Sequence, residues 1–324
     1  MCALFGWLDY KHIIPYKILK KLTQALANAA EERGTDAAGI SYIKDDRVTI
    51  FKRPKPAHKI HFNAPDGTTA IMGHTRLTTQ GNQKFNFNNH PFYGRADKEF
   101  SFAHNGVLYN DMELRKTKNL PATHIETDSY VAVQLIEQQK KLDFNSLKSM
   151  AEAVQGNFTF TILDEDNSLY IIKGSNPMCL LHFEMLGIYI YASTESIMKN
   201  ALRKVNMLSF PYTRIETAQG NIIRIDSSGI ITRSEFENKE DFRYASWLKY
   251  SYDDFEDDYY NQHEQLLLEM CGCYGIDEDD IIMLLDYGYS ADEIEDMLCD
   301  YTLITDTVRA VKGEKEYEDF LCEI

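Results

Sequence analysis

The feature of this sequence that most limits its possible folds is a succession of short apolar segments separated by turn residues. β-Branched and aromatic residues fill these segments, and Gly, Asp and Asn bound them, as is typical of strands. We predict strands over residues 39–43, 48–52, 69–73, 100–103, 157–163, 168–172, 187–192, 221–225 and 230–232. In one of them, Phe158, Phe160 and Ile162 alternate with threonines and therefore share one face.

Helical spacing of apolar residues occurs between these strands. Residues 17–31 carry Leu19, Leu22 and Leu26 at the spacing of an amphipathic helix that ends near Gly34. Further helices are predicted over residues 129–141, 145–154 and 195–203. Many antiparallel-looking strands, with helices grouped before and between them, predict an α+β fold in which helices cover two stacked sheets.

The charge of the chain is divided unevenly along its length. The whole chain has a net charge of −16, but residues 1–235 contain 28 Lys and Arg against 24 Asp and Glu. Residues 236–324 contain 6 against 26. We therefore predict a domain over 1–235 and an acidic tail over 236–324 that docks on a basic protein surface or is simply solvated. This acidity argues against nucleic acid and against an anionic membrane surface as partners.

The tail contains the pattern of a small helical hairpin. A helical segment over 279–285 is followed by a turn at Gly288, and Ser290 and Glu293 form a capping box that begins a second helix. The apolar residues expected to face inward from this helix are Ile294, Met297 and Leu298. The preceding segment, 253–260, is predicted to be an exposed acidic linker or helix start.

Six cysteines occur without the basic stretch and apolar run of a signal peptide, which predicts a reducing, cytoplasmic location. No apolar run approaches the roughly 20 residues that span a bilayer, so no membrane partner is expected. Cys271 and Cys273 are two thiols without two further ligands at a standard spacing, which makes a poor zinc site. We predict no metal and no cofactor.

Cys2 follows the initiator methionine. Removal of Met1 would give this residue both a thiol and a free α-amine. An α-amine has an ordinary pKa of about 7.7–8.0, so near neutral pH it is partly unprotonated and can accept the thiol proton. Cys2 alone can therefore supply the nucleophile and the base of an amide hydrolysis. A cysteine at this position is commonly inert, however, so its meaning depends on the rest of the sequence.

Five further motifs follow Cys2-Ala-Leu-Phe-Gly6 in a fixed order. They are Glu32-Arg-Gly-Thr-Asp-Ala-Ala-Gly-Ile40, Gly73-His-Thr-Arg-Leu-Thr-Thr-Gln-Gly81, Asn88-Asn-His-Pro-Phe92, Ala103-His-Asn-Gly-Val107 and Glu126-Thr-Asp128. Together with the N-terminal cysteine, this set closely resembles the glutaminase domain of class II glutamine amidotransferases, the N-terminal-nucleophile (Ntn) type found in glucosamine-6-phosphate synthase and amidophosphoribosyltransferase. The resemblance covers about residues 1–235. It implies the four-layer αββα sandwich of the Ntn hydrolases.

The resemblance also implies a reaction, in which a thioester on Cys2 releases glutamate and ammonia from glutamine. An amide NH₂ and an unhindered backbone N–H can converge on a developing oxyanion, and the resemblance assigns this role to Asn105 and Gly106. The planar fork of an arginine suits the α-carboxylate of glutamine, and an aspartate suits its α-ammonium. The resemblance assigns these roles to Arg76 and Asp128.

Other motif residues are expected to line or support this site. Thr79 and Gln80 would line the glutamine pocket with hydroxyl and backbone groups. Arg33 and Asp36 resemble a family turn that supports Cys2. The resemblance gives mainly structural positions to the histidines of the motifs, which are His74, His90 and His104.

Each principal assignment has a structural alternative. Asn105-Gly106 between apolar residues is a strong signal for a type I′ hairpin turn. Arg76 can form a surface ion pair, and Asp128 can cap the helix predicted over 129–141. Two positions also depart from the family pattern, because Leu77 stands where Trp is common and Gln80 replaces a His. The loop that closes over glutamine is therefore expected to differ.

Three functions are compatible with the sequence. The first is an amidotransferase subunit that makes ammonia for a separate acceptor synthetase or ligase, because residues 236–324 resemble no synthase and are fewer than a typical acceptor domain. The second is a stand-alone amidohydrolase that acts on a γ-glutamyl amide or peptide. The third is an inactive scaffold that acts through its acidic tail, and the complete set of motif residues argues against it. A homo-oligomer is compatible with each.

Overall fold

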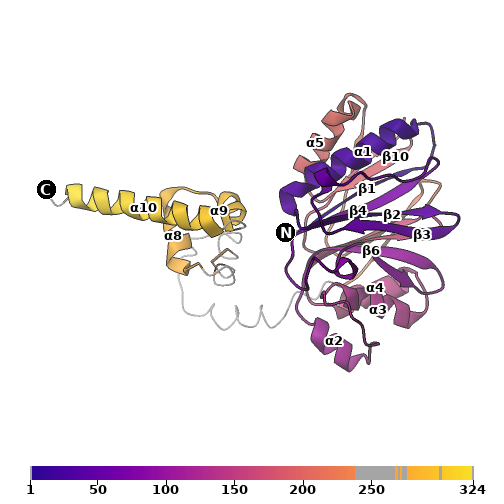
Figure 1. The fold of residues 1–324 in the computed structure, drawn as a ribbon, viewed down its shortest axis with the longest axis horizontal. Helices are drawn as coiled ribbons and strands as arrows, with labels where there is room; N and C mark the ends of the chain where they lie inside the picture. Colours follow the sequence, from indigo (N-terminus) through magenta and orange to yellow (C-terminus); the bar gives the residue numbers. More distant parts are fainter. Residues whose placement is uncertain (1, 238–266, 269–270, 272–275, 299–300, 323–324) are drawn as a thin grey trace. The chain divides into compact units, whose positions relative to one another are not determined.

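Two stacked antiparallel sheets form the centre of the N-terminal part of the chain (Figure 1). The structure is a computed structural model that describes residues 2–237, 267–268, 271, 276–298 and 301–322. The first sheet has the strand order β11-β9-β10-β1-β4-β2-β3, with β1 (Ala3–Asp9), β2 (Ala37–Lys44), β3 (Arg47–Arg53), β4 (Ala70–Arg76), β9 (Cys179–Phe183), β10 (Ile188–Ala192) and β11 (Thr213–Ile215). The second has the order β13-β12-β8-β7-β6-β5, with β5 (Phe92–Arg95), β6 (Glu99–Leu108), β7 (Gly156–Asp164), β8 (Leu169–Lys173), β12 (Asn221–Ile225) and β13 (Ile231–Glu235).

Helices cover the outer face of each sheet (Figure 1). The first sheet is covered by α1 (Tyr16–Ala29) and α5 (Glu195–Lys204), and the second by α3 (Tyr130–Gln139) and α4 (Phe144–Ala153), with the short α2 (Asp111–Thr117) beside α3. Leu22 and Leu26 of α1 pack in one core with Phe5 and Trp7 of β1. The predicted four-layer αββα sandwich is confirmed.

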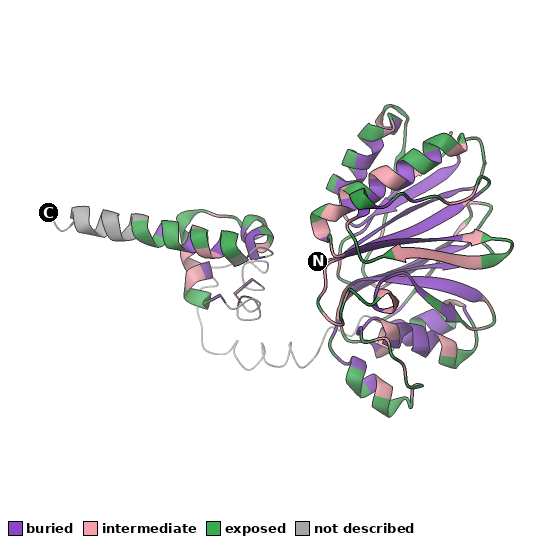
Figure 2. Cartoon of the chain, viewed as in Figure 1, coloured by how far each residue is buried: buried purple, intermediate pink, exposed green. Residues whose placement is uncertain are grey.

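Alternation along the strands decides which side chains meet between the sheets. Phe5 and Trp7 of β1 belong to the core under the helices, whereas Leu4 and Leu8 belong to the core between the sheets, together with Ala103 of β6. Figure 2 shows that the strands are largely buried and that the exposed residues concentrate on the outer faces of the helices and in the loops. Even-numbered positions of β1 therefore face the second sheet.

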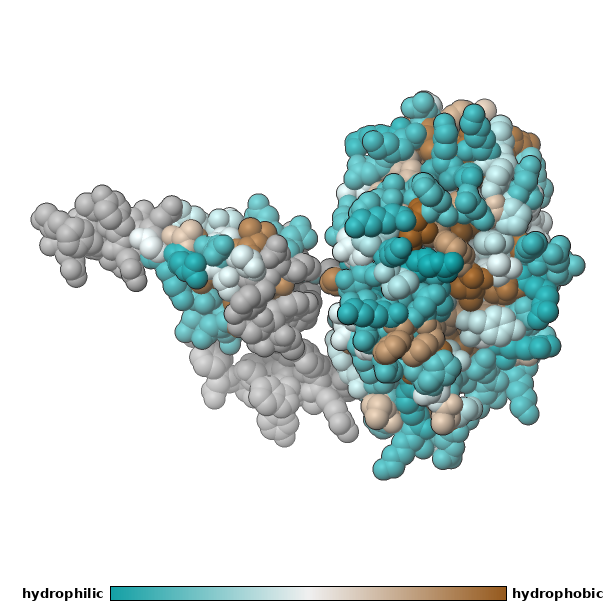
Figure 3. Space-filling view, viewed as in Figure 1, coloured by the Kyte–Doolittle hydropathy of each residue, from teal (hydrophilic) through white to brown (hydrophobic). Residues whose placement is uncertain are grey.

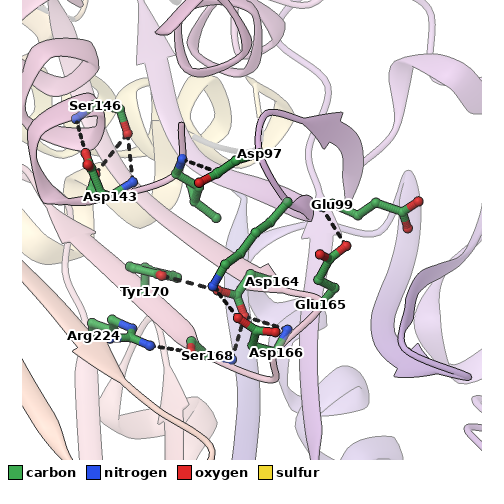
Figure 4. A network of polar contacts seen from close by, with 12 residues as sticks. Asp97, Glu99, Asp143, Ser146, Asp164, Glu165, Asp166, Ser168, Tyr170 and Arg224 are labelled. Atoms are coloured by element: carbon green, nitrogen blue, oxygen red, sulfur yellow. Dashed lines mark hydrogen bonds and ion pairs between the residues drawn. The ribbon is translucent and has the colours of Figure 1, made fainter. Parts of the chain in front are cut away.

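Asp164 closes the hairpin between β7 and β8 (Figure 4). Its Oδ1 accepts hydrogen bonds from the backbone N–H groups of Asp166 (3.1 Å) and Ser168 (2.8 Å), and its Oδ2 accepts from the Tyr170 hydroxyl (3.2 Å). Lys98 Nζ lies 3.7 Å from Oδ2. Burial raises the pKa of this carboxyl group, and the surrounding donors oppose that effect. This cluster holds the C-terminal end of β7, the strand that begins at Gly156.

The N-terminal unit extends past the boundary predicted at residue 235. The side chain of Phe236 is only 5% exposed, and its ring lies 6.0 Å from that of Phe158 in the core under α3 and α4. The Phe236 N–H also donates to Gly220 O (2.8 Å). The contact pattern divides the chain into Met1–Tyr244 and Ala245–Ile324. On the visible face of the first unit, Figure 3 shows mostly hydrophilic side chains with separated apolar patches.

The described part of the second unit contains α8 (Glu278–Tyr287), α9 (Ala291–Leu298) and α10 (Tyr301–Cys322). Gly288 ends α8 with a φ of +112°, and the Ser290 N–H donates to Glu293 Oε2 (2.9 Å), as the predicted capping box requires. The third helix, α10, was not predicted. Its residues join those of α8 and α9 in one core, which includes Ile281, Leu284, Ile294, Met297, Leu298, Ile304 and Val308.

Two sequence predictions about this region concern residues that the structure describes only in part. Cys271 is buried in the helical core, but Cys273 and the predicted linker 253–260 lie outside the described residues. Within the described ranges, no group of three or more His, Cys, Asp or Glu side chains could hold a metal ion. None of the helices described has the length and apolar character that crossing a bilayer requires.

All nine predicted strands and the four helices predicted before residue 235 occur in the structure. The prediction missed β1, β5, β9, β11 and α2. The strands β1 and β9 lack the alternating pattern, because both of their faces are covered and their residues are almost all buried.

Three histidines of the motifs are buried, and the His104 ring lies on the helix-facing side of β6, beside Phe160. His74 of β4 donates from Nε2 to the backbone carbonyl of His104 in β6 (2.9 Å), and the rings of His74 and His90 are 4.3 Å apart. Burial lowers the pKa of all three imidazoles, that of His74 to about 3. The folded protein therefore holds them uncharged at neutral pH.

We expect these histidines to make the fold sensitive to acid. In the unfolded chain a histidine has a pKa of about 6.5, so below that value the unfolded state binds more protons than the folded state and stability falls as the pH falls. The variant His90→Phe tests this, because neither ring nitrogen of His90 has a hydrogen-bond partner among the described residues. The free energy of unfolding is measured in urea at about pH 7 and at about pH 5.5. On acidification it should fall by about 1 kcal/mol less in the variant than in the unchanged chain. Equal losses in both proteins would contradict the expectation.

Candidate active site

Cys2 directly precedes β1, which lies in the middle of the first sheet. Because Leu4 faces the second sheet, alternation places the Cys2 side chain on the same side. The thiol is partly buried, and Sγ donates to Leu77 O (3.4 Å). Arg33 Nε donates to the Cys2 carbonyl (3.0 Å). The backbone of Cys2 is thus held by the turn that the sequence predicted to support it.

This turn also packs tightly on the end of β4. A Cβ atom at Gly34 would lie 2.4 Å from the carbonyl carbon of Arg76, so only glycine allows the approach. The Asp36 N–H donates to Arg76 O (2.9 Å), and the Thr78 N–H donates to Asp36 Oδ2 (2.8 Å). Asp36 therefore shapes the segment that leaves β4 next to Cys2.

Arg76 is the last residue of β4, which lies between β1 and β2. Its side chain is 3% exposed. Nη1 donates to Asn89 Oδ1 (2.7 Å), and Nη2 donates to the carbonyls of Gln80 (2.5 Å) and Gly81 (3.3 Å). The alternative of a surface ion pair is therefore wrong. Gln80 uses its backbone on Arg76, and the side chain of Thr79 is exposed.

Asp128 is buried in the segment that precedes α3. Its Oδ2 accepts from the Leu108 N–H (2.6 Å) at the end of β6, and its Oδ1 accepts from Ser129 Oγ (3.2 Å). Ser129 Oγ also lies 2.8 Å from His104 Nδ1. The residue at the N-cap of α3 is Ser129, so the alternative that Asp128 caps this helix is wrong.

Asn105 and Gly106 lie inside β6, where they pair with Thr159 and Phe158 of β7. The alternative of a hairpin turn is therefore wrong. Gly106 has a φ of +140°, and a Cβ atom there would lie 1.9 Å from Asn157 O, so this distortion of the strand requires glycine.

The Asn105 side chain points between the sheets. Ser101, four residues earlier on β6, bonds through Oγ to Ser41 Oγ of β2 in the first sheet (2.7 Å), and alternation gives Asn105 the same face. Asn105 is 0% exposed, yet neither Oδ1 nor Nδ2 has a hydrogen-bond partner among the described residues. A buried amide without partners is costly and points to a ligand.

Arg76 and Asp128 both influence the Cys2 thiol electrostatically. Burial raises the pKa of the Cys2 thiol, while Arg76 lowers it and Asp128 raises it. The site therefore combines a nucleophile, an unpaired amide donor, one cation and one anion. Sequence reasoning missed the Leu108 N–H that donates to Asp128 and the Asn89 side chain that accepts from Arg76, because these contacts join separate segments.

Comparison with known proteins shows what the chain is similar to. Residues 74–199 match a glutamine amidotransferase domain family. The chain is 27% identical over 248 residues to the glutamine–fructose-6-phosphate aminotransferase (isomerizing) of Staphylococcus aureus, which covers 70% of this chain and 39% of that protein. The corresponding protein of Staphylococcus epidermidis is 28% identical over 187 residues, which covers 55% of this chain and 30% of that protein. The chain thus matches well under half the length of these relatives.

Two solved structures share the fold. A glutamine phosphoribosylpyrophosphate amidotransferase from B. subtilis, complexed with ADP and GMP, has a TM-score of 0.58 at 19% identity over 73% of this chain and 49% of that chain. A structure described as the allosteric regulatory enzyme of purine biosynthesis has a TM-score of 0.59 at 20% identity over the same shares. Residues 74–199 thus match a glutamine amidotransferase domain, and the two structures show that the chain shares their fold.

Proposed function

We propose that this chain hydrolyses the side-chain amide of glutamine through a thioester on Cys2. The observation that carries the proposal is the buried, unpartnered amide of Asn105, which faces the sheet that bears Cys2. Such a donor is suited to an oxyanion that forms only in the transition state. The relatives named above use glutamine by their printed names, which supports the choice of substrate.

Activation of Cys2 requires a base, because burial keeps its thiol protonated at neutral pH. His74 is unsuited, since its Nε2–H is bonded to His104 O and its pKa is lowered to about 3. Both oxygens of Asp128 already accept hydrogen bonds. We assign the role to the α-amine of Cys2, which removal of Met1 would free.

The reaction then follows in two stages. The amine takes the thiol proton as Sγ attacks the amide carbon, and Asn105 and Gly106 stabilise the resulting oxyanion. The C–N bond breaks, and the leaving nitrogen takes the proton from the amine and departs as ammonia. Water, deprotonated by the same amine, attacks the thioester, which releases glutamate and restores the thiol.

Two variants test this chemistry. Cys2→Ala should abolish the release of glutamate from glutamine, because the nucleophile is lost. An N-terminal extension that stays attached to Cys2 should abolish it as well, because the residue then has no free amine. Glutamate release is measured together with the N-terminal mass of the purified protein. Normal turnover by the extended protein would rule out the amine as the base, even if Cys2 proved essential.

Arg76 and Asp128 are proposed to hold the α-carboxylate and the α-ammonium of glutamine. These side chains are both buried and carry opposite charges, which suits a zwitterion, and both influence the pKa of the Cys2 thiol that would attack its amide. The neutral side chain of Asn105 takes no part in this recognition. Binding and chemistry are thus assigned to different residues.

The division can be tested by steady-state kinetics with glutamine. Asp128→Asn should raise KM strongly, since it removes the charge that pairs with the α-ammonium. Asn105→Ala should instead lower kcat by about a hundredfold or more, because it removes a donor to the transition state. Circular dichroism checks that both variants fold. Small and equal changes in both would show that the pocket is misplaced.

The ammonia is proposed to serve a separate acceptor synthetase or ligase, with residues 245–324, the larger part of the predicted tail 236–324, as the docking module. The module concentrates acidic charge, and its described helices α8, α9 and α10 have a core of their own. Surface charges of this kind mainly change the rate and salt dependence of association.

A truncation tests the module. Because Phe236 belongs to the first unit, the chain should be cut after residue 244 rather than after 235. We expect the truncated protein to fold and to hydrolyse glutamine with unchanged kcat and KM, but to lose partners that co-purify with the full chain at low salt. If the truncated protein fails to fold, the tail belongs to the amidotransferase core or its oligomer interface instead.

A further inference from the structure

We propose that Asn89 is the residue that positions Arg76 for the α-carboxylate of the substrate. The inference rests on the proposed function and adds a residue to which the sequence motifs gave no role. Asn89 lies between β4 and β5, in the motif Asn88-Asn-His-Pro-Phe92.

The side chain of Asn89 joins Arg76 to the loop that follows it. Asn89 is 0% exposed; its Oδ1 accepts from Arg76 Nη1 (2.7 Å), and its Nδ2 donates to Gln83 O (2.8 Å). The same loop supplies the carbonyls of Gln80 and Gly81 to Arg76 Nη2. One buried amide therefore fixes both the guanidinium group and the loop that bonds to it.

The backbone of Asn89 is itself anchored on β3. Lys52 Nζ donates to Asn89 O and to Pro91 O (2.9 Å), and Asn86 Nδ2 donates to Lys52 O (3.0 Å). A residue held at its main chain by a neighbouring strand can keep its side chain in one place. Asn89 is therefore a fixed acceptor for Arg76 rather than a mobile one.

An uncharged acceptor suits this position. An arginine has five N–H groups, and the three bonds to Asn89, Gln80 and Gly81 use three of them within the described structure. The others stay available to a carboxylate, and the full positive charge is kept because all three acceptors are neutral. An aspartate at position 89 would keep the hydrogen bond but cancel the charge that attracts the substrate.

The experiment compares Asn89→Ala and Asn89→Asp with Asn110→Ala in the full chain. Asn110 is likewise a buried asparagine whose side chain bonds to backbone groups, those of Ala153 and Gln155, and no described contact joins it to Arg76 or Asn89, so it is the matched control. We expect KM for glutamine to rise about tenfold or more in both Asn89 variants, with kcat changed by less than about threefold. The control should leave both constants close to those of the unchanged chain.

Two inhibitors separate positioning from general damage. Glutaric acid monoamide keeps the carboxylate of glutamine and lacks its ammonium, whereas 4-aminobutanamide keeps the amine and lacks the carboxylate. The Asn89 variants should weaken inhibition by the first about tenfold and leave inhibition by the second unchanged. If inhibition by both compounds weakened to a similar extent, the positioning role would be wrong.

The outcomes also separate this inference from the proposed function. If the unchanged chain, with Met1 removed, releases no glutamate from glutamine, both fail. If it does and the KM of Asn89→Ala and Asn89→Asp is unchanged, or only kcat falls, the positioning role alone is wrong. Circular dichroism monitors folding. If Asn89→Ala does not fold, the kinetics of Asn89→Asp alone test the positioning role. Failure of both to fold would show that Asn89 serves the fold and not the substrate.

Discussion

The hydrogen bond from His74 Nε2 to His104 O joins the two sheets where their functional side chains meet. His74 pairs with Leu4 of β1, two residues from Cys2, and His104 directly precedes Asn105. Together with the bond between Ser41 Oγ and Ser101 Oγ, this contact holds the first sheet, next to the thiol, against β6, which carries the amide donor. An uncharged imidazole keeps this bond through neutral pH, because burial lowers the pKa of His74 to about 3. Placement of reacting groups to within about 1 Å is what such a site needs.

The site is built around polar groups that the fold leaves without partners. Asn105 Nδ2 and Oδ1, Thr78 Oγ1 beside Arg76 and Thr127 Oγ1 beside Asp128 are buried and have no hydrogen-bond partner among the described residues. Each such group costs about 1–3 kcal/mol of stability. The apolar cores on both faces of each sheet offset this cost. Donors and acceptors held ready in this way need no reorganisation when the substrate arrives.

Local patterns predicted the elements of the fold better than they predicted contacts. The alternation of Phe158, Phe160 and Ile162 was enough to identify β7, but β1 is buried on both faces and carries no such pattern. The Asn-Gly signal at 105–106 was overridden by pairing with β7, which keeps the chain extended. The bond between Asn89 and Arg76 joins residues 13 positions apart through a loop, and no periodicity encodes it. The motifs pointed to Arg76 and Asp128 but not to the residues that hold them.

The two charged residues bear on how the Cys2 thiol would respond to glutamine. Arg76 and Asp128 act on the pKa of Cys2 with opposite sign, and in the proposed complex the zwitterion would add a carboxylate at the first and an ammonium at the second. The two additions largely cancel at the thiol, so burial remains the dominant influence with or without substrate. The thiol therefore stays protonated, which limits its oxidation. In the proposed mechanism the amine takes this proton as Sγ attacks the amide carbon, so that the position of the substrate rather than the concentration of thiolate would control the attack.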